Sequence, residues 1–309
     1  MDAKKRELIV QVKAAVLKEA RGMRELNAVI PVTGTRYDLP VGDREINIVY
    51  FKAKQEHAPL IVGFHGGGFL FGGSALNDDM WSAVRDELGM NVASVDYRQS
   101  PDFQWREALD DAYDASIYLK EHAADFGFDP EQIYVMGASA GAGLAATACI
   151  YAKQKGTPIY KGQILLYPFA DTATDPDSKG EGSLTGPVMY VFNELHCSPQ
   201  EAKNPLVSPV FVTEEEAAGL PPAIIVYADI DCLKHEGMRF AETLRAAGVP
   251  VADRLEEGMP HGYFENGFSD PEKMELSFLS EMEVNLIKDG SCHRSSEKTM
   301  AFIKENLSI

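Results

Sequence analysis

The chain has 309 residues, of which 45% are hydrophobic and 25% are charged, a profile that is typical of globular proteins. This length allows one large domain or two small ones, and a single α/β domain of this size can bury a full core. The formal net charge of −18 gives an acidic surface that repels nucleic acid and anionic membranes, so we expect neither as a partner.

The N-terminal segment, residues 1–22, has basic residues but no uninterrupted apolar stretch, so it does not resemble a signal peptide. No apolar run in the sequence approaches the length of a transmembrane helix. The four cysteines lack paired spacing and predict neither a zinc site nor a disulfide framework; they are Cys149, Cys197, Cys232 and Cys292. These observations predict a protein of the reducing cytoplasm.

Hydrophobic periodicity predicts helices and strands that alternate along the chain. Apolar side chains at helical spacing predict helices over residues 4–25, 81–88, 105–124, 234–247 and 297–306, and over the alanine-rich segment that ends near residue 151. Short apolar runs predict strands over residues 45–51, 60–64, 91–97, 133–136, 162–167, 223–227 and 251–255. This alternation indicates a mostly parallel sheet with helices on both faces.

Residues 170–215 interrupt the pattern with Asp, Thr, Gly, Ser and Pro and with only short helical pieces, such as 188–195. We interpret this stretch as an excursion from the sheet rather than a second domain. The whole chain, residues 1–309, is therefore predicted to form one α/β domain.

One stretch has the pattern of a nucleophile elbow, in which a strand, a G-x-S-x-G turn and a helix follow one another. Residues 133–136 form the predicted strand, and Gly137 and Gly141 flank Ser139. Ser139 would sit on a sharp turn at the end of the sheet, and the helix that follows would point its free N–H groups at the site. A five-residue motif is weak evidence alone, because ordinary strand-to-helix turns also match it.

A serine nucleophile needs a base, and His261 is the distinctive candidate among seven histidines. It follows the last predicted strand in a loop shaped by glycine and proline, and such loops carry the active sites of doubly wound folds. His235 lies in a predicted helix and His65 opens a glycine loop. The others are expected to be solvated; they are His57, His122, His196 and His293.

A carboxylate must orient the base, and two candidates follow the predicted strand 223–227. Either Asp229 or Asp231 could accept the Nδ1 proton of His261, and either could instead cap the next helix. The residues alone do not separate them. The chain order of Ser, Asp and His is that of α/β-hydrolases in both cases.

Donors for an oxyanion are expected from the backbone N–H of Ala140 and from the loop His65-Gly66-Gly67-Gly68. Three glycines let the backbone present N–H groups where a side chain would obstruct the substrate. A phosphate-binding loop is the alternative, but the Walker lysine and the G-x-G-x-x-G spacing are missing. We interpret His65 as a structural support for this loop.

These motifs together resemble those of the hormone-sensitive-lipase-like branch of the α/β-hydrolases, which includes many bacterial carboxylesterases. The match extends from about residue 45 to residue 265. The family motifs HGGGF, DYRLAPE, GDSAG, DPLRDEG and pHGF have counterparts in residues 65–69, 96–102, 137–141, 231–237 and 260–263.

The resemblance implies which residues act. The leading Asp of DPLRDEG is the family's triad acid, which favours Asp231, and Gly67 and Gly68 would be the loop donors beside Ala140. The implied fold is an eight-stranded, mostly parallel sheet with a small helical cap, formed here by about residues 1–28 and 175–205. The implied reaction is hydrolysis of small-molecule carboxylic esters through an acyl-enzyme, with no metal or cofactor. Many relatives are dimers, so a homodimer is an expectation from the family alone.

Three features depart from the family pattern. Ala138 replaces the usual Asp before the nucleophile, which removes a carboxylate near the elbow. Cys232 replaces the Pro after the acid, and residues 269–296 form a longer stretch than usual before the final helix, which we expect to contact the cap or a partner subunit.

The expected function is a serine carboxylesterase for short acyl chains, and the chain-length preference comes from the family. Deacetylation of sugars and hydrolysis of lactones or amides would use the same triad and stay open. A non-catalytic binding relative would lack the histidine that stands at position 261. A dehalogenase or dienelactone-type hydrolase would need Asp or Cys at position 139.

Overall fold

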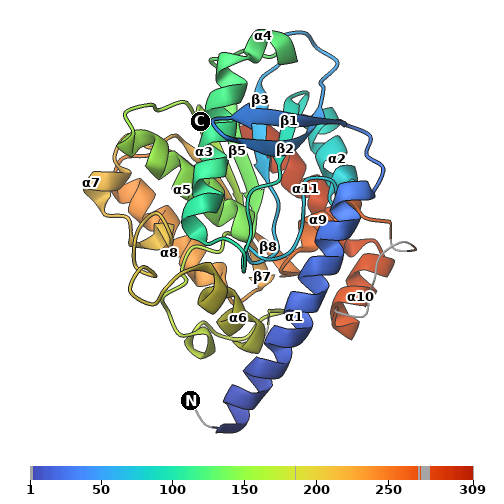
Figure 1. Ribbon diagram of the computed structural model, residues 1–309, viewed down its shortest axis with the longest axis vertical. Coiled ribbons are helices and arrows are strands. Elements are labelled where there is room, and N and C mark those ends of the chain that lie inside the picture. Colours follow the sequence, from blue (N-terminus) through green and yellow to red (C-terminus); the bar gives the residue numbers. More distant parts are fainter. Residues whose placement is uncertain (1–2, 185, 271, 273–278, 309) are drawn as a thin grey trace.

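The computed structural model describes residues 3–184, 186–270, 272 and 279–308. At its centre lies an eight-stranded sheet with the strand order β1-β2-β4-β3-β5-β6-β7-β8 (Figure 1). The β1–β2 and β2–β4 pairs are antiparallel and all other pairs are parallel. The strands are β1 Thr35–Val41, β2 Arg44–Phe51, β3 Leu60–Phe64, β4 Asn91–Val95, β5 Ile133–Ala138, β6 Gly162–Leu166, β7 Ala223–Ile230 and β8 Val251–Pro260.

Helices cover both faces of this sheet (Figure 1). One core cluster joins one face to α3, α5 and α8, and a second joins the other face to α2, α9 and α11. The helices are α1 Ala3–Val29, α2 Asp78–Leu88, α3 Trp105–Glu121, α4 Ala123–Phe126, α5 Ala140–Gln154, α6 Gly186–His196, α7 Glu214–Ala217, α8 Lys234–Ala246, α9 Tyr263–Phe268, α10 Glu281–Lys288 and α11 Ser291–Asn306. The predicted mostly parallel sheet with two helical layers is confirmed.

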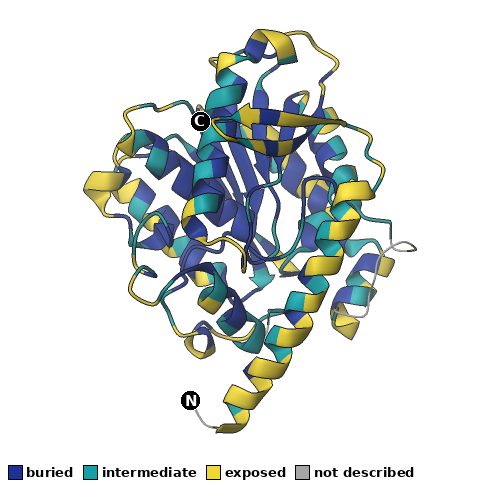
Figure 2. Cartoon of the chain, viewed as in Figure 1, coloured by how far each residue is buried: buried dark blue, intermediate teal, exposed yellow. Residues whose placement is uncertain are grey.

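The central strands β3, β4, β5 and β6 are buried at every residue, as Figure 2 shows by their dark colour. A parallel strand that is covered on both faces needs apolar side chains on both sides, which is why these strands form continuous apolar runs in the sequence. Helix α5 is also buried along nearly its whole length, because its alanines and glycines let the sheet and α3 approach it closely.

Helix α1 lies outside the two layers and packs against α6 (Figure 1). Only Ile9, Val16 and Ala20 are buried among its 27 residues, so most of its surface is exposed or half-buried (Figure 2). Its C-terminal end is held by Asn27, whose amide donates to Asp96 at 3.0 Å and accepts the Ala75 N–H at 2.9 Å. The pair α1 and α6 therefore lies over the loops that follow β3 and β4.

Near the ends of the chain the structure differs from the prediction, which did not include strand β1 or helices α9 and α10. Strand β1 was not predicted, because only Leu39 of its residues is buried and no apolar run marks it. The final helix begins at Ser291 rather than at residue 297. Of the long stretch 269–296, residues 271 and 273–278 lie outside the described part of the chain, and so do residues 1–2 and 185 of the expected cap.

The packing of α2 against the sheet depends on Trp81, which is 1% exposed. A Cβ on Gly63 of β3 would lie 2.7 Å from its ring, and its Nε1 is buried without a hydrogen-bond partner. We expect Trp81→Ala to lower the free energy of unfolding by about 3–5 kcal/mol. Trp81→Phe should lower it much less, because it also removes an unsatisfied donor. Urea unfolding followed by circular dichroism measures both, and equal losses would contradict this account.

Candidate active site

Ser139 occupies a sharp turn between β5 and α5, with φ 56° and ψ −121°. The turn is tight because three backbone segments meet there. A Cβ on Gly137 would lie 2.2 Å from the carbonyl carbon of Gly141, and a Cβ on Gly141 would lie 2.1 Å from the oxygen of Phe64. No other residue type fits these two positions, and the result is the geometry of a nucleophile elbow.

The side chains of Ser139, His261 and Asp231 form a chain of hydrogen bonds. Ser139 Oγ lies 2.7 Å from His261 Nε2, and His261 Nδ1 lies 2.7 Å from Asp231 Oδ2. The second oxygen of Asp231 accepts the Leu233 N–H at 2.9 Å. This network assigns the proton to Nδ1 and leaves Nε2 to accept from the hydroxyl. The structure thus brings together the three residues that the sequence predicted as nucleophile, base and acid.

The alternative acid, Asp229, lies in a different environment. Its carboxylate is 2.9 Å from Lys234 Nζ and accepts the Gly258 N–H at 3.2 Å. Its side chain is 38% exposed, whereas that of Asp231 is fully buried. The two candidates are therefore separated by geometry, and Asp231 is the carboxylate that contacts His261.

Charges around His261 set its protonation. Burial alone would lower the pKa of its imidazole, but the charge and hydrogen bond of Asp231 outweigh it. Glu265 and Glu236 add to this attraction, so the pKa of His261 lies above its ordinary value. A buried base with a partner carboxylate of this kind is typical of catalytic sites.

The glycine loop after β3 folds toward Ser139. Gly67 and Gly68 have φ of 116° and 61°, and the loop closes on itself because Phe71 N–H donates to Gly67 O at 2.8 Å. A Cβ on Gly68 would lie 2.5 Å from the ring of Phe192, so α6 lies directly on this loop. Ala140 opens α5, where the first N–H groups have no acceptor within the helix.

His65 is fully buried at the base of this loop. Its Nδ1 lies 2.8 Å from Gly66 O, and its ring stacks on Tyr97 with centroids 4.3 Å apart. The amide of Gln99 lies 3.2 Å from its Nε2. Burial lowers the pKa of His65, although the charge of Asp96 opposes the shift. A neutral ring with these contacts agrees with a structural support for the loop.

The prediction of a solvated His196 is wrong. This side chain is 3% exposed and stacks on Phe69 with ring centroids 3.6 Å apart. Burial lowers its pKa to about 3, so the ring is neutral. Nothing in the local sequence signals this, because the burial arises where the end of α6 meets the glycine loop.

Sequence reasoning missed the contacts that fasten residues 179–183 to the site. Ser183 Oγ accepts the His261 N–H at 2.9 Å, and a Cβ on Gly182 would lie 2.4 Å from Cys232 N. Lys179 forms a buried ion pair of 2.6 Å with Glu236. Burial raises the pKa of Glu236 to about 7, although Lys179 opposes the shift. The segment is thus fastened to the loops of both the acid and the base.

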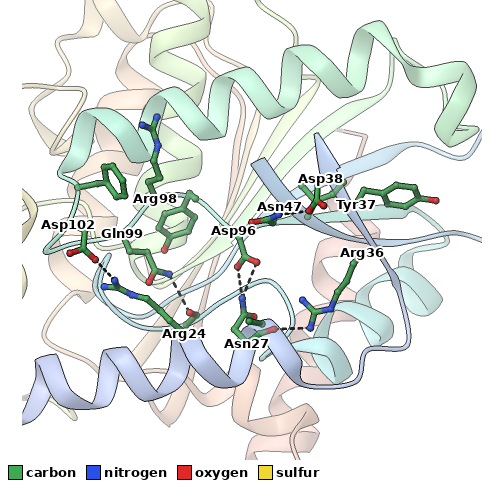
Figure 3. A pocket seen from close by; sticks show the side chains of 15 residues that line it. Arg24, Asn27, Arg36, Tyr37, Asp38, Asn47, Asp96, Arg98, Gln99 and Asp102 are labelled. Atoms are coloured by element: carbon green, nitrogen blue, oxygen red, sulfur yellow. Dashed lines mark hydrogen bonds and ion pairs between the residues drawn. The ribbon is translucent and has the colours of Figure 1, made fainter. Parts of the chain in front are cut away.

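A separate polar cavity of ≈450 Å³ lies between α1, β1, β2 and the loop after β4 (Figure 3). Two arginines of its lining are in ion pairs, Arg24 with Asp102 at 2.6 Å and Arg98 with Asp111 at 2.8 Å. Gln99 lines the cavity and also reaches His65, but the Ser139, His261 and Asp231 side chains do not line it. The cavity is therefore distinct from the site at Ser139.

Within the described residues, no group of three or more His, Cys, Asp or Glu side chains is placed to hold a metal ion. In the same part of the chain, no helix is both long enough and apolar enough to span a membrane.

A family model described as "alpha/beta hydrolase fold" matches residues 61–265. The chain belongs to this family. That result confirms the resemblance to the hormone-sensitive-lipase-like branch. The match extends from β3 and the glycine loop to the first residues of α9, and so includes Ser139, Asp231 and His261.

Several esterases that are similar to this chain agree with this assignment. Esterase LipI of Mycobacterium tuberculosis is 33% identical over 68% of this chain and 67% of its own length. Carboxylesterase NlhH of the same species is 31% identical over 72% and 71%. Carboxylic ester hydrolase LipN is 35% identical, but the match spans only 57% of its length. The Pyrobaculum calidifontis esterase structure superposes with a TM-score of 0.77 at 27% identity, covering 100% of this chain and 94% of that one.

The contact between Asp231 and His261 can be tested without a substrate. We expect Asp231→Asn to lower the pKa of His261, because it removes the charge that outweighs burial. Asp229→Asn is the matched control, since that carboxylate pairs with Lys234 instead. An NMR titration of the His261 ring measures both, and an equal shift in the two variants would contradict the assignment.

Proposed function

We propose that this chain is a serine carboxylesterase that hydrolyses small carboxylic esters through an acyl-enzyme. The single observation that carries the proposal is the pair of 2.7 Å contacts that links Ser139 through His261 to Asp231. A hydroxyl in this position can transfer its proton as it attacks a carbonyl carbon. Family membership and the relatives, which include an esterase and a carboxylesterase, support the same reaction.

In the proposed reaction Ser139 Oγ attacks the ester carbonyl while His261 Nε2 takes its proton. Asp231 keeps the imidazole in the required tautomer and stabilises the imidazolium that forms. The N–H groups of Gly67, Gly68 and Ala140 bind the tetrahedral oxyanion, and each such donor is worth roughly 3–4 kcal/mol in the transition state. His261 then protonates the leaving alcohol. In the second half it takes a proton from water, which attacks the acyl-enzyme carbonyl, and returns that proton to Ser139.

This cycle predicts the acid limb of the pH profile. His261 must be neutral to accept the Ser139 proton, so kcat/KM should rise as the pH increases through its pKa. Because Asp231 raises that pKa, the rise should begin at a higher pH than for an unperturbed histidine.

A single domain with a small cap completes the proposal. Helix α1 and residues 175–205, which include α6, would form the cap of the domain 1–309. Phe192 of α6 lies over Gly68 and meets the ring of Phe71 edge-on, with centroids 5.9 Å apart. Two aromatic rings directly beside the oxyanion loop leave little length for an acyl chain, which favours short-chain esters.

We propose a cytoplasmic location and a homodimeric state as well. The four cysteines are all free and buried thiols, and a reducing compartment keeps thiols in this form. The homodimer rests on the family alone, and light scattering of the purified chain tests it. The acidic net charge of −18 disfavours nucleic acid as a partner.

The reaction and the chain-length preference can be tested with the p-nitrophenyl esters of acetate, butyrate, octanoate and palmitate. We expect the wild type to favour acetate and butyrate, because the aromatic rings of α6 and the glycine loop limit the acyl chain. Ser139→Ala should lower kcat on the order of 10⁶-fold, to near the background. Ser308→Ala, at an exposed serine near the C-terminus, should leave kcat unchanged. Equal turnover by the wild type and Ser139→Ala would contradict the proposal.

Phe192→Ala tests the limit on chain length directly. Removing the ring above Gly68 opens space, so the ratio of kcat/KM for octanoate to that for butyrate should rise by about tenfold, roughly the effect of one to two methylenes of pocket space. Phe103→Ala, which removes a ring that is 40% exposed and lines the separate polar cavity, is the matched control. A ratio that is the same in both variants would show that Phe192 does not bound the acyl site.

A further inference from the structure

A buried carboxyl group that the proposed reaction does not use lies next to the elbow. Glu265 is on α9, four residues after His261 in the sequence. The point where Gly66 would carry a Cβ is 3.4 Å from Glu265 Oε1 and 3.4 Å from Ser139 Cβ. The Glu265 carboxyl, the glycine loop and the nucleophile therefore meet at one place.

The second oxygen of Glu265 is held by Tyr167, whose hydroxyl donates to Oε2. Tyr167 is fully buried at the end of β6 and has a positive φ of 36°. Burial raises its pKa well above the ordinary value, so the phenol keeps its proton and acts as the donor. The rings of Tyr167 and His261 also pack edge to face, with centroids 4.9 Å apart. Glu265 thus contacts the base through Tyr167 as well as the loop.

The neighbouring position on the elbow, residue 138, is where the family motif GDSAG has Asp and this chain has Ala. Ala138 is 3% exposed and belongs to the same apolar cluster as Tyr167 and Phe264. Its side chain therefore points to the face of the sheet that α9 covers. The family motif places a carboxylate on this face from β5, at position 138. This chain instead has a carboxylate, Glu265, on the helix α9 that covers the face.

We propose that Glu265 is a positioning residue that supplies from α9 the carboxylate that Ala138 does not supply from the elbow. By holding Tyr167, it fixes the surface against which the His261 ring packs, and it supports Gly66 at the base of the oxyanion loop. This role belongs to the proposed esterase reaction and rests on it.

Glu265 is one of several groups that face His261. Asp231 follows β7 and contacts Nδ1, Glu236 comes from α8, and Tyr167 follows β6. Ser139 contacts the other ring nitrogen. Glu236 is paired with the buried Lys179 at 2.6 Å, so the charge of Glu265 is less compensated than that of Glu236. Burial raises the pKa of Glu265, while Tyr167 and the charge of His261 oppose the shift.

Three variants separate position from charge. Glu265→Ala should lower kcat by about 10–100-fold with little change in KM, because the loop and the base lose their support. Glu265→Gln keeps a partner for Tyr167, so kcat should fall less. It should also shift the acid limb of kcat/KM to lower pH, because a negative charge that favours the imidazolium is lost. Glu242→Gln makes the same charge change at an exposed site, and it should change neither kcat nor the acid limb of kcat/KM.

The decisive test is a rescue. The double variant that carries Ala138→Asp and Glu265→Ala should have a kcat at least about tenfold higher than that of Glu265→Ala alone. Ala138→Asp in the presence of Glu265 should lower kcat, because two carboxylates would then share one buried region. The effect of Ala138→Asp on kcat would thus be positive without Glu265 and negative with it. Such coupling between the two positions is not expected if Glu265 has a purely structural role.

The outcomes distinguish this role from the esterase proposal. A wild type without Ser139-dependent turnover would overturn the esterase function, and the role of Glu265 with it. Ser139-dependent turnover together with a Glu265→Ala kcat within twofold of the wild type would overturn only the role of Glu265. Loss of activity without rescue by Ala138→Asp, in a double variant that unfolds at the same urea concentration as the wild type, would overturn the relocation of the carboxylate.

Discussion

The approach of β3, β5 and α5 at the elbow is the constraint on which the rest of the site depends. Side-chain atoms at positions 137 and 141 would lie within 2.2 Å of backbone atoms, so these segments can meet only because both residues are glycine. The same approach forces Ser139 into a positive φ of 56°, a conformation that costs on the order of 1–3 kcal/mol. That energy is offset by the buried sheet and helix on either side.

Strand order then determines which loops can reach Ser139. The strands β5, β6, β7 and β8 are parallel neighbours, so the loops that follow them open at one edge of the sheet. Asp231 follows β7 and His261 follows β8, although 92 and 122 residues separate them from Ser139. Ser183 adds a contact from the segment after β6, because its Oγ accepts the His261 N–H. The site is thus assembled from loops that the sheet holds side by side.

The parts that could be predicted from the sequence are those with a local cause. Fully buried strands are continuous apolar runs, and the elbow needs two glycines at fixed spacing, so both are visible in a single chain. Strand β1 is exposed and leaves no such run. His196 is buried where α6 meets the glycine loop. These outcomes depend on contacts between distant segments, which neither periodicity nor motif spacing encodes.

The electrostatics of His261 follow from a balance of two opposing effects. Burial favours a neutral ring, while the carboxylates of Asp231, Glu265 and Glu236 favour a charged one. A general base must be neutral before it accepts a proton and must hold that proton long enough to pass it to the leaving group. An apolar site without carboxylates would disfavour the second state, and a buried site in which all three carboxylates were unpaired would disfavour the first. Lys179 pairs with Glu236 and moderates the attraction, which leaves Asp231 as the dominant partner.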